Sequence, residues 1–461
     1  MTKTNPLLLA FYGDDFTGST DALEFLTLAG VKTILFLKNP EQKDLDKFPE
    51  IQAIGVAGKS RSMSPNDMEN ELIPVFNKFK KFNPNHVHYK VCSTFDSAPH
   101  VGNIGKAIEI GSTIFQQRTV FVSPSAPHLG RYCAFGNLFA KMGIAGDGKI
   151  YRIDRHPSMS KHPVTPALEG DLTVHLSKQT NKSIGLINVT KIDEGKSAVI
   201  SKVKENKDSE ILFFDGLNKT HLEIIGGVFN EFANENPLFS VGSSGIAMAL
   251  GLDWKSKGII DGERKFNVCG ENGPILVLSG SCSPVTENQI NYAIDNGFAE
   301  IALGVEAISN SNQNQVIEEV VGQIVANFEN GKSIVLHTSK GTEDPRISDS
   351  ELFFKNQGFE SEDIQNACSS NYGHVLGQIA KQVLAQTDIK RILLAGGDTS
   401  SYAASELNIT ALEMIAPLAP GAPLCKAISD DEWVNGLELN FKGGQVGTRD
   451  YFIKVLKGEK L

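Results

Sequence analysis

The segment 7–24 constrains the fold more than any other part of the chain, because it passes from an apolar run through a polar turn into a helix-compatible stretch. Residues 7–12 have the length of a buried strand, and Gly13, Asp14 and Asp15 follow at once. An open parallel sheet presents ligand-binding groups at its carboxyl edge in this order. Adjacent side chains of extended backbone point to opposite sides, so we expect one carboxylate to face a ligand and the other to secure the turn. The alternative is that both merely end the strand and cap the helix.

Length and composition indicate a globular protein of two or three domains at about 150 residues each. The chain has 461 residues, of which 41% are hydrophobic and 21% charged. The net charge of −10, without a basic cluster, predicts no nucleic-acid partner. No apolar run approaches the roughly 18 residues of a membrane span and no leader-like segment is present, so we expect no membrane association and a cytoplasmic location. The six scattered cysteines predict reduced thiols, not disulfides or a zinc site.

Apolar runs alternate with helical stretches, which predicts an α/β fold with mostly parallel sheets. The region 254–273 is rich in Lys, Asp and Gly and lacks periodicity, which is typical of a connection between domains. We expect an N-terminal domain over 1–255, a linker over 256–273 and a C-terminal domain over 274–461. Residues 416–425 contain three prolines and a glycine and predict an extended wrap over the surface. Buried strands are predicted over residues 31–37, 51–56, 86–91, 119–122, 275–278, 333–337 and 392–395, and an amphipathic helix over 372–384.

Three glycine-rich turns mark the second half of the chain, at residues 278–286, 395–401 and 442–447. The first two lie between a predicted strand and a predicted helix, where small residues leave backbone N–H groups open to an anion. One such turn serves topology more often than a ligand, but three in one domain favour a nucleotide or phosphate site. Asp398 would repel phosphate unless a cation lay between them, so it would either help to hold Mg²⁺ or cap the helix.

Two loops of the first half carry cations after predicted strands. Lys90 opens the segment 90–96, Arg131 closes the segment 123–131, and a Pro-rich loop covers 162–166. Lys90 and Arg131 can clamp a carboxylate, while Ser and Thr hydroxyls can bind sugar hydroxyls. The alternative is that both cations are solvated surface residues, although their position after strand ends favours a site.

In chain order, these motifs resemble those of the four-carbon acid sugar kinase family, ATP-dependent kinases of small sugar acids, over essentially the whole length. Segment 13–21 resembles the family's N-terminal Asp-Asp-Φ-Thr-Gly signature, and 125–131 is similar to its Ser-Ala-Pro-x-x-Gly-Arg motif. Residues 241–247 resemble the end of its first domain. Its three nucleotide-binding segments resemble residues 279–284, 396–400 and 442–447.

The resemblance implies two α/β domains with an active site in the cleft between them, a sugar acid on the N-terminal domain, and ATP with Mg²⁺ on the C-terminal domain. Asp14 and Asp15 would be the catalytic residues. The substrate side would comprise Thr17, Lys90, Ser93, Thr94, Arg131, His162 and Thr165. The ATP side would comprise Ser279, Ser281, Gly396, Gly397, Asp398, Thr399, Gly443 and Gly444. The motifs assign no metal ligands.

The segment that begins at Lys90 departs from the family's pattern Lys-x-Asp-Ser-Thr-x-Arg-Gly. Cys92 stands in the place of the carboxylate, and Asp96 stands in the place of the arginine. A lost cation and a moved carboxylate should change which acid is recognised, so the substrate would be a four-carbon acid or a related oxo or branched acid. The turns at 396–399 and 443–447 depart mildly from the family's Gly-Gly-Glu-Thr and Ser-Gly-Asn-Phe-Gly.

We therefore predict phosphoryl transfer from MgATP to a hydroxyl of a small sugar acid, by an enzyme for which a homodimer is one candidate assembly. Asp14 or Asp15 would orient or deprotonate the hydroxyl, and Arg131 with Lys90 would bind the acid. One alternative is a sugar-acid dehydrogenase or isomerase, and the absence of a G-x-G-x-x-G fingerprint argues against the dehydrogenase. The other is a non-catalytic two-domain sugar-acid-binding protein.

Overall fold

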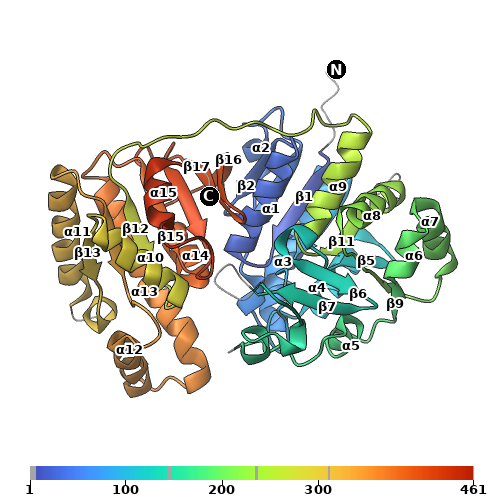
Figure 1. The fold of residues 1–461 in the computed structure, drawn as a ribbon, viewed down its shortest axis with the longest axis horizontal. Coiled ribbons are helices and arrows are strands. Elements are labelled where there is room, and N and C mark those ends of the chain that lie inside the picture. Colours follow the sequence, from blue (N-terminus) through green and yellow to red (C-terminus); the bar gives the residue numbers. More distant parts are fainter. Residues whose placement is uncertain (1–6, 143–147, 163, 234–236, 310–311, 460–461) are drawn as a thin grey trace. The chain divides into compact units, whose positions relative to one another are not determined.

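The chain divides into two compact units, Met1–Lys265 and Phe266–Leu461. Figure 1 shows the first in blue to green and the second in yellow to red. The division falls inside the segment 256–273, in which the sequence predicts a linker. This computed structural model describes residues 7–142, 148–162, 164–233, 237–309 and 312–459.

The first unit is built on a parallel sheet with the strand order β2-β3-β1-β4-β11-β5-β10-β9. Its strands are β1 (Leu9–Gly13), β2 (Thr33–Phe36), β3 (Ala53–Ala57), β4 (His86–Lys90), β5 (Val120–Ser123), β9 (Ile184–Ile187), β10 (Ile211–Phe214) and β11 (Leu238–Gly242). A separate antiparallel sheet of β6 (Arg131–Ala134), β7 (Asn137–Lys141) and β8 (Ile150–Arg152) was not among the predicted elements.

Helices of the first unit form two layers. In one, α1, α9, α8 and α7 contact each other in a row, and in the other α3, α4 and α5 do so. Such layers cover both faces of a parallel sheet, and β1, β2, β4, β5, β10 and β11 are accordingly buried along their whole length. The helices are α1 (Phe16–Leu28), α2 (Gln42–Leu45), α3 (Pro65–Phe82), α4 (Ile104–Phe115), α5 (Leu172–Ser177), α6 (Val189–Asp193), α7 (Lys196–Glu205), α8 (Lys219–Phe232) and α9 (Gly245–Ser256).

The order of these strands creates a switch point beside β1. The chain runs from β1 to β2 and β3 on one side of it and then crosses to β4 on the other side. The loops that leave β1 and β4 therefore diverge and open a crevice at the carboxyl edge, where ligands bind in open α/β sheets. Gly13 at the end of β1 lies opposite Lys90 at the end of β4, so the Asp-Asp turn and the lysine meet at this point.

The second unit has the strand order β13-β14-β12-β15-β18-β17-β16. Its parallel strands are β12 (Leu276–Ser279), β13 (Ala299–Ala302), β14 (Ile334–His337), β15 (Arg391–Ala395) and β18 (Glu438–Lys442). An antiparallel hairpin of β16 (Ala411–Ala419) and β17 (Ala422–Ile428) extends this sheet beyond β18. Its helices are α10 (Pro284–Asp295), α11 (Gln313–Glu329), α12 (Pro345–Asn356), α13 (Ser361–Leu384), α14 (Gly397–Glu406) and α15 (Tyr451–Lys457). A second switch point lies between β12 and β15, because the chain passes from β12 to β13 and β14 before it crosses to β15.

The prediction of a surface wrap over residues 416–425 is wrong, because this segment belongs to the hairpin of β16 and β17. Its alternate apolar residues are buried in the core of the second unit. The register of the pair shifts on both sides of Ala416. Pro417 lies in this irregular stretch, where the backbone N–H that proline lacks is least needed for pairing between the strands. Gly421, at a φ of 80°, makes the reversal between the strands.

The predicted fold class is confirmed, since both units are α/β with mostly parallel strands. The predicted helix 372–384 is the second half of α13, and α9 extends to Ser256 at the start of the expected linker. The six cysteines are free thiols, as predicted. Among the described residues, no helix is both long and apolar enough to span a membrane.

Candidate active site

The two carboxylates that follow β1 converge on one guanidinium. Arg61, in the single helical turn Ser60–Ser62 after β3, contacts Asp14 Oδ1 through Nη2 at 2.8 Å and Asp15 Oδ2 through Nη1 at 2.9 Å. The expectation that the carboxylates point to opposite sides is wrong, because the chain turns into α1 directly after Asp15. Sequence reasoning missed Arg61, although it follows a strand end just as Lys90 and Arg131 do.

Asp15 secures the turn into α1. It is the N-cap residue, and its Oδ1 accepts a hydrogen bond from the backbone N–H of Gly18 at 2.9 Å. The hydroxyl of Thr17 donates to Asp15 Oδ2 at 2.8 Å. Thr17, predicted on the substrate side, is thus engaged with the cap.

Asp14 lies deeper in the fold than Asp15, with 3% of its side chain exposed against 17%. Burial raises the pKa of Asp14 and outweighs the charge of Arg61, while the charge of Asp15 adds to the rise. Burial also acts to raise the pKa of Asp15, but the charges of Arg61 and Lys90 and the hydrogen bonds from Thr17 and Gly18 lower it overall. Asp15 therefore stays ionised, and Asp14 is the stronger proton acceptor of the pair.

Lys90 lies buried against the first turn of α1. A Cβ atom on Gly18 would stand 2.2 Å from Lys90 Nζ, so only a glycine lets the ammonium approach the helix here. Asp21, one turn further along α1, places Oδ2 at 4.0 Å from the same Nζ. Burial raises the pKa of Asp21, although the charge of Lys90 opposes the rise.

Cys92 carries a neutral thiol, and its backbone contacts Asp14. Its backbone N–H donates to Asp14 Oδ2 at 3.3 Å, and its Sγ lies 3.0 Å from the hydroxyl of Thr94. Burial raises the pKa of Cys92 to about 11, so the side chain is not a thiolate at neutral pH. The carboxylate of the family's pattern is thus replaced by an uncharged group.

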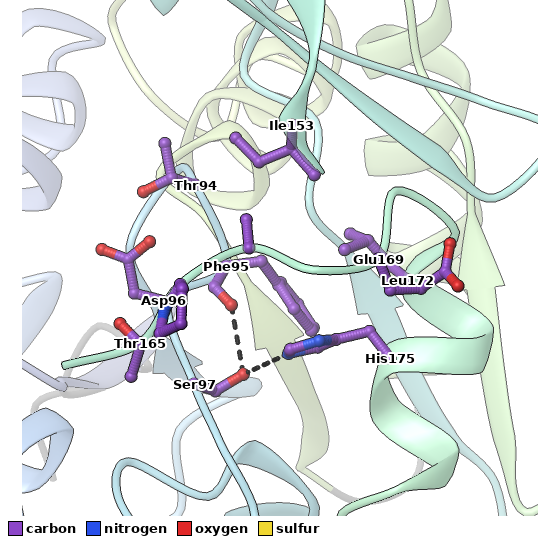
Figure 2. Close-up of a pocket in the computed structure, with 11 residues that line it drawn as sticks. Thr94, Phe95, Asp96, Ser97, Ile153, Thr165, Glu169, Leu172 and His175 are labelled. Carbon is purple, nitrogen blue, oxygen red and sulfur yellow. Dashed lines mark hydrogen bonds between the residues drawn. The ribbon is translucent and has the colours of Figure 1, made fainter. Parts of the chain in front are cut away.

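A small pocket lies beside this turn, within the first unit (Figure 2). Figure 2 shows Thr94, Asp96 and Thr165 along one side of it and Leu172 and His175 along the other. Among the described residues, Asp96 Oδ1 is buried without a hydrogen-bond partner, so this oxygen is free to accept a further hydrogen bond. The remaining lining residues are Phe95, Ser97, Ile153, Pro166, Ala167 and Glu169.

Three other predicted substrate residues, Ser93, His162 and Arg131, are not among the residues that line this pocket. His162 accepts from the backbone N–H of Thr165 through Nδ1 at 3.0 Å, and Ser93 is half-buried in the turn before Thr94. Arg131 donates through Nη1 to the carbonyl oxygen of Leu129 at 2.9 Å, and its Nε is buried without a partner among the described residues. Burial lowers the pKa of Arg131, and the nearby charge of the Asp96 side chain opposes that shift.

In the second unit, the three glycine turns meet at the switch point between β12 and β15. A Cβ on Gly280 would stand 2.4 Å from Thr399 Cγ2, and one on Gly444 would stand 2.8 Å from Ser281 Oγ. Gly396, at a φ of 120°, faces the backbone of Gly280 and Ser281, at 3.3 Å from a Cβ position. Glycine is needed here because a side chain at Gly280 or Gly444 would collide with side chains of a neighbouring turn, and Gly396 adopts a positive φ against the backbone of another.

These turns leave hydroxyls and a helix N-terminus at the same edge. Within the described part of the chain, Ser279 Oγ and Ser400 Oγ are buried without partners. Gly396 is the N-cap residue of α14 and Gly397 its exposed first residue, so Asp398 follows within the first turn and is not the cap. The side chain of Asp398 lies outside the described residues. Gly443 stands between Lys442 and Gly444 in the third turn.

Among the described residues, no group of three or more His, Cys, Asp or Glu side chains forms a metal site. Mg²⁺ does not require such a cage in a kinase, because it binds through one or two carboxylates together with the phosphates of the nucleotide. The buried hydroxyls and open N–H groups of the glycine turns fit a nucleotide that brings its own cation.

These two edges define the class of the protein. One α/β unit holds paired carboxylates and cations at its switch point, and the other holds three converging glycine turns at its own. A model described as a sugar-binding N-terminal domain matches residues 9–250, and one described as a nucleotide-binding C-terminal domain matches residues 276–452. The chain therefore belongs to the four-carbon acid sugar kinase family, as the sequence motifs predict.

Curated relatives span the whole chain. A 3-oxo-isoapionate kinase of Paraburkholderia graminis is 38% identical over 453 residues, which cover 98% of this chain and 94% of the relative. A 3-oxo-tetronate kinase of Pseudomonas savastanoi is 26% identical over 455 residues, with 98% and 97% covered. Both relatives are kinases of oxo sugar acids by name, which confirms the prediction of a sugar-acid kinase.

Solved structures share the fold. A crystal structure of a Haemophilus influenzae protein of the DUF1537 family has a TM-score of 0.70 at 24% identity, covering 97% of this chain and 98% of that one. A Salmonella typhimurium LT2 structure, provisionally described as a tRNA synthase, has a TM-score of 0.76 at 24% identity with the same coverage. At this identity, the likeness shows the fold alone and nothing about activity.

Proposed function

We propose that the protein transfers the γ-phosphoryl group of ATP to a hydroxyl of a small 3-oxo sugar acid. The observation that carries the proposal is that one chain combines the Arg61-bound carboxylate pair with three converging glycine turns, each set at the switch point of its own sheet. Phosphoryl transfer needs an acceptor site and a phosphate cradle, and little covalent chemistry beyond their positioning.

Asp14 is our candidate for the group that orients the acceptor hydroxyl and takes its proton. Its two oxygens receive hydrogen bonds from Arg61 Nε and Nη2 and from the Cys92 N–H, which leaves one lone-pair site for a substrate hydroxyl. Its raised pKa makes it a better base than an ordinary aspartate. Asp15 is already engaged by Gly18, Thr17 and Arg61, which supports a positioning role.

Arg131 is our candidate for binding the carboxylate of the acid. Lys90 and Arg61 already face Asp14, Asp15 and Asp21, whereas Arg131 forms no ion pair within 4.0 Å among the described residues. Its guanidinium is held by backbone carbonyls and keeps Nε free to donate. Thr94, Thr165 and Asp96 would then bind hydroxyl groups of the sugar.

The uncharged Cys92 supports an oxo or branched acid over a simple tetronate. A carboxylate in its place would accept hydrogen bonds from a substrate hydroxyl, which a neutral thiol does poorly. The kinase that is 38% identical acts, by its name, on 3-oxo-isoapionate. Mg²⁺ would arrive with ATP and neutralise phosphate charge, and Asp398 is an acidic residue within the second glycine turn.

The test is ADP release from MgATP across a panel of 3-oxo and branched sugar acids, with tetronates for comparison. We expect 3-oxo acids to stimulate ADP release well above the rate without an acceptor. Asp14→Asn should abolish that stimulation while nucleotide binding is retained. If no acid stimulates ADP release, the proposed function is wrong. If Asp14→Asn keeps the full rate, the proposed role of Asp14 is wrong.

A further inference from the structure

Lys442 is a buried cation directly beneath the glycine turns of the second unit. It is the last residue of β18, lies opposite Ala395 of β15 in the parallel register, and has 0% of its surface exposed. Lysine is rarely buried without a charged partner. Among the described residues, Lys442 has no carboxylate within 4.0 Å of Nζ. The catalytic roles proposed above make no use of it.

Lys442 is tied to the phosphate cradle through one hydroxyl. Its Nζ donates to Thr286 Oγ1 at 2.9 Å, and Thr286 Oγ1 in turn donates to the carbonyl oxygen of Gly444 at 2.9 Å. Ser281 Oγ donates to the same Thr286 oxygen at 3.1 Å. Thr286 thereby uses its one donor and both acceptor sites, and it links the lysine to two of the three turns.

The surroundings of Lys442 supply no compensating charge from the described residues. The side chains that α10 buries toward the sheet are Thr286, Gln289, Ile290 and Ala293. Glu287 of α10 stands against Gly341, and the hydroxyl of Tyr451 on α15 donates to Asn440. Burial alone lowers the pKa of Lys442, to about 7, so the side chain titrates near neutral pH.

We propose that Lys442 is a positioning residue for nucleotide phosphates and that its positive charge acts on the glycine turns through Thr286. Nucleotide binding therefore places a proton on Lys442 Nζ. This inference rests on the proposed function, because it takes a nucleoside di- or triphosphate as the ligand of the cradle. The physical reason is that negatively charged phosphate near Lys442 favours the ammonium over the neutral amine. The proton comes from solvent, and no covalent bond changes.

Two measurable consequences follow. At pH 8, the free lysine is mostly a neutral amine, so binding should take up close to one proton per nucleotide. The affinity for nucleotide should fall as the pH rises above about 7, by up to about tenfold per pH unit. A lysine with a merely structural role would change neither quantity.

The experiment is calorimetric titration of the full chain with MgADP at pH 8 in two buffers of different ionisation enthalpy. The dependence of the heat on the buffer gives the number of protons taken up, and we expect a value near one for the wild type. Lys442→Met should reduce it to near zero. Lys381→Met, an exposed lysine of α13 in the same unit, is the matched control and should keep the wild-type value.

Thr286→Val removes the connecting hydroxyl, keeps the lysine, and should lower the uptake, which provides a second test if Lys442→Met does not fold. A wild-type uptake near zero with clear nucleotide binding overturns this inference and leaves the proposed function standing. An uptake that survives unchanged in Lys442→Met also overturns it. Absence of nucleotide binding in the wild type overturns the proposed function itself.

Discussion

Arg61 and Asp14 are joined by two hydrogen bonds, from Nη2 to Oδ1 at 2.8 Å and from Nε to Oδ2 at 3.2 Å. The same guanidinium also contacts Asp15, so one cation from the turn after β3 holds both carboxylates of the turn after β1. A planar, permanently charged fork suits this task better than a lysine would. Arg61 therefore sets the geometry of the proposed acceptor site and opposes the rise that burial gives to the pKa of Asp14.

Removal of Arg61 should damage both stability and activity. Arg61→Ala leaves two largely buried carboxylates without their cation, and loss of one partner from a buried pair costs roughly 3 kcal/mol of unfolding free energy. Urea unfolding measures this cost, and ADP release should fall in parallel. The control is Lys32→Ala, which breaks an exposed pair with Glu50 and should cost less than about 1 kcal/mol. Equal costs for the two variants would contradict the assignment.

Asparagine substitutions should separate the two carboxylates. Asp14→Asn removes the proposed proton acceptor and should lower kcat by about 10²–10⁴-fold. Asp15→Asn keeps a side chain that caps helices well, so α1 should persist and kcat should fall less. Steady-state kinetics with circular dichroism make the comparison. A larger loss of kcat in Asp15→Asn would reverse the roles of the two residues.

The pH dependence of kcat/KM should carry the raised pKa of Asp14. The base must be ionised, and burial raises its pKa above that of an ordinary aspartate, so activity should rise with pH through this raised pKa. The acid limb of the profile should therefore lie at a higher pH than an unperturbed Asp would give. Measurement of kcat/KM from pH 4 upward tests this, and a limb at or below the ordinary Asp value would count against it.

Gly18→Ala should disturb the acceptor site although it adds one methyl group. The new Cβ would stand 2.2 Å from Lys90 Nζ and 2.3 Å from Asp15 Oδ1, so the lysine or the cap must move. We expect a loss of kcat/KM with the fold retained. Gly322→Ala is the matched control, because that helical glycine of α11 has open space around its Cβ position, and alanine favours helix there. Wild-type kinetics in Gly18→Ala would show that Lys90 does not need this position.

Lys442→Met should make the protein more resistant to heat, and more so at low pH. The pKa of Lys442 is about 7 in the folded protein against 10.5 for the ordinary side chain. Below pH 7, the folded wild-type protein bears the full cost of the buried charge. Between about pH 7 and 10, only the unfolded chain binds the proton on Lys442, so the stability of the wild type rises with pH. The gain in Tm should thus be several °C at pH 6 and smaller at pH 9. Equal gains at both pH values would contradict a buried, titrating amine.

Local patterns in the sequence predict the parts of the site that one chain segment can build alone. The strand, turn and helix from Leu9 to Leu28 follow from an apolar run, two acidic residues and a Thr-Gly-Ser-Thr turn. The glycine turns are equally local, because a glycine is needed wherever backbones approach closely. Local reasoning failed at 416–425, where prolines suggested a wrap and burial of alternate side chains made a hairpin.

By itself, the sequence determined the α/β alternation, the Asp-Asp turn after β1, the three glycine turns and the family to which the chain belongs. Only the tertiary structure decided that Arg61 would join Asp14 to Asp15, that Thr286 would join Lys442 to Ser281 and Gly444, and which carboxylate would be the buried one. The physical reason is that strand order, not sequence distance, sets which loops share a carboxyl edge. Burial and the distances between charges, which set pKa values, exist only once that order is in place.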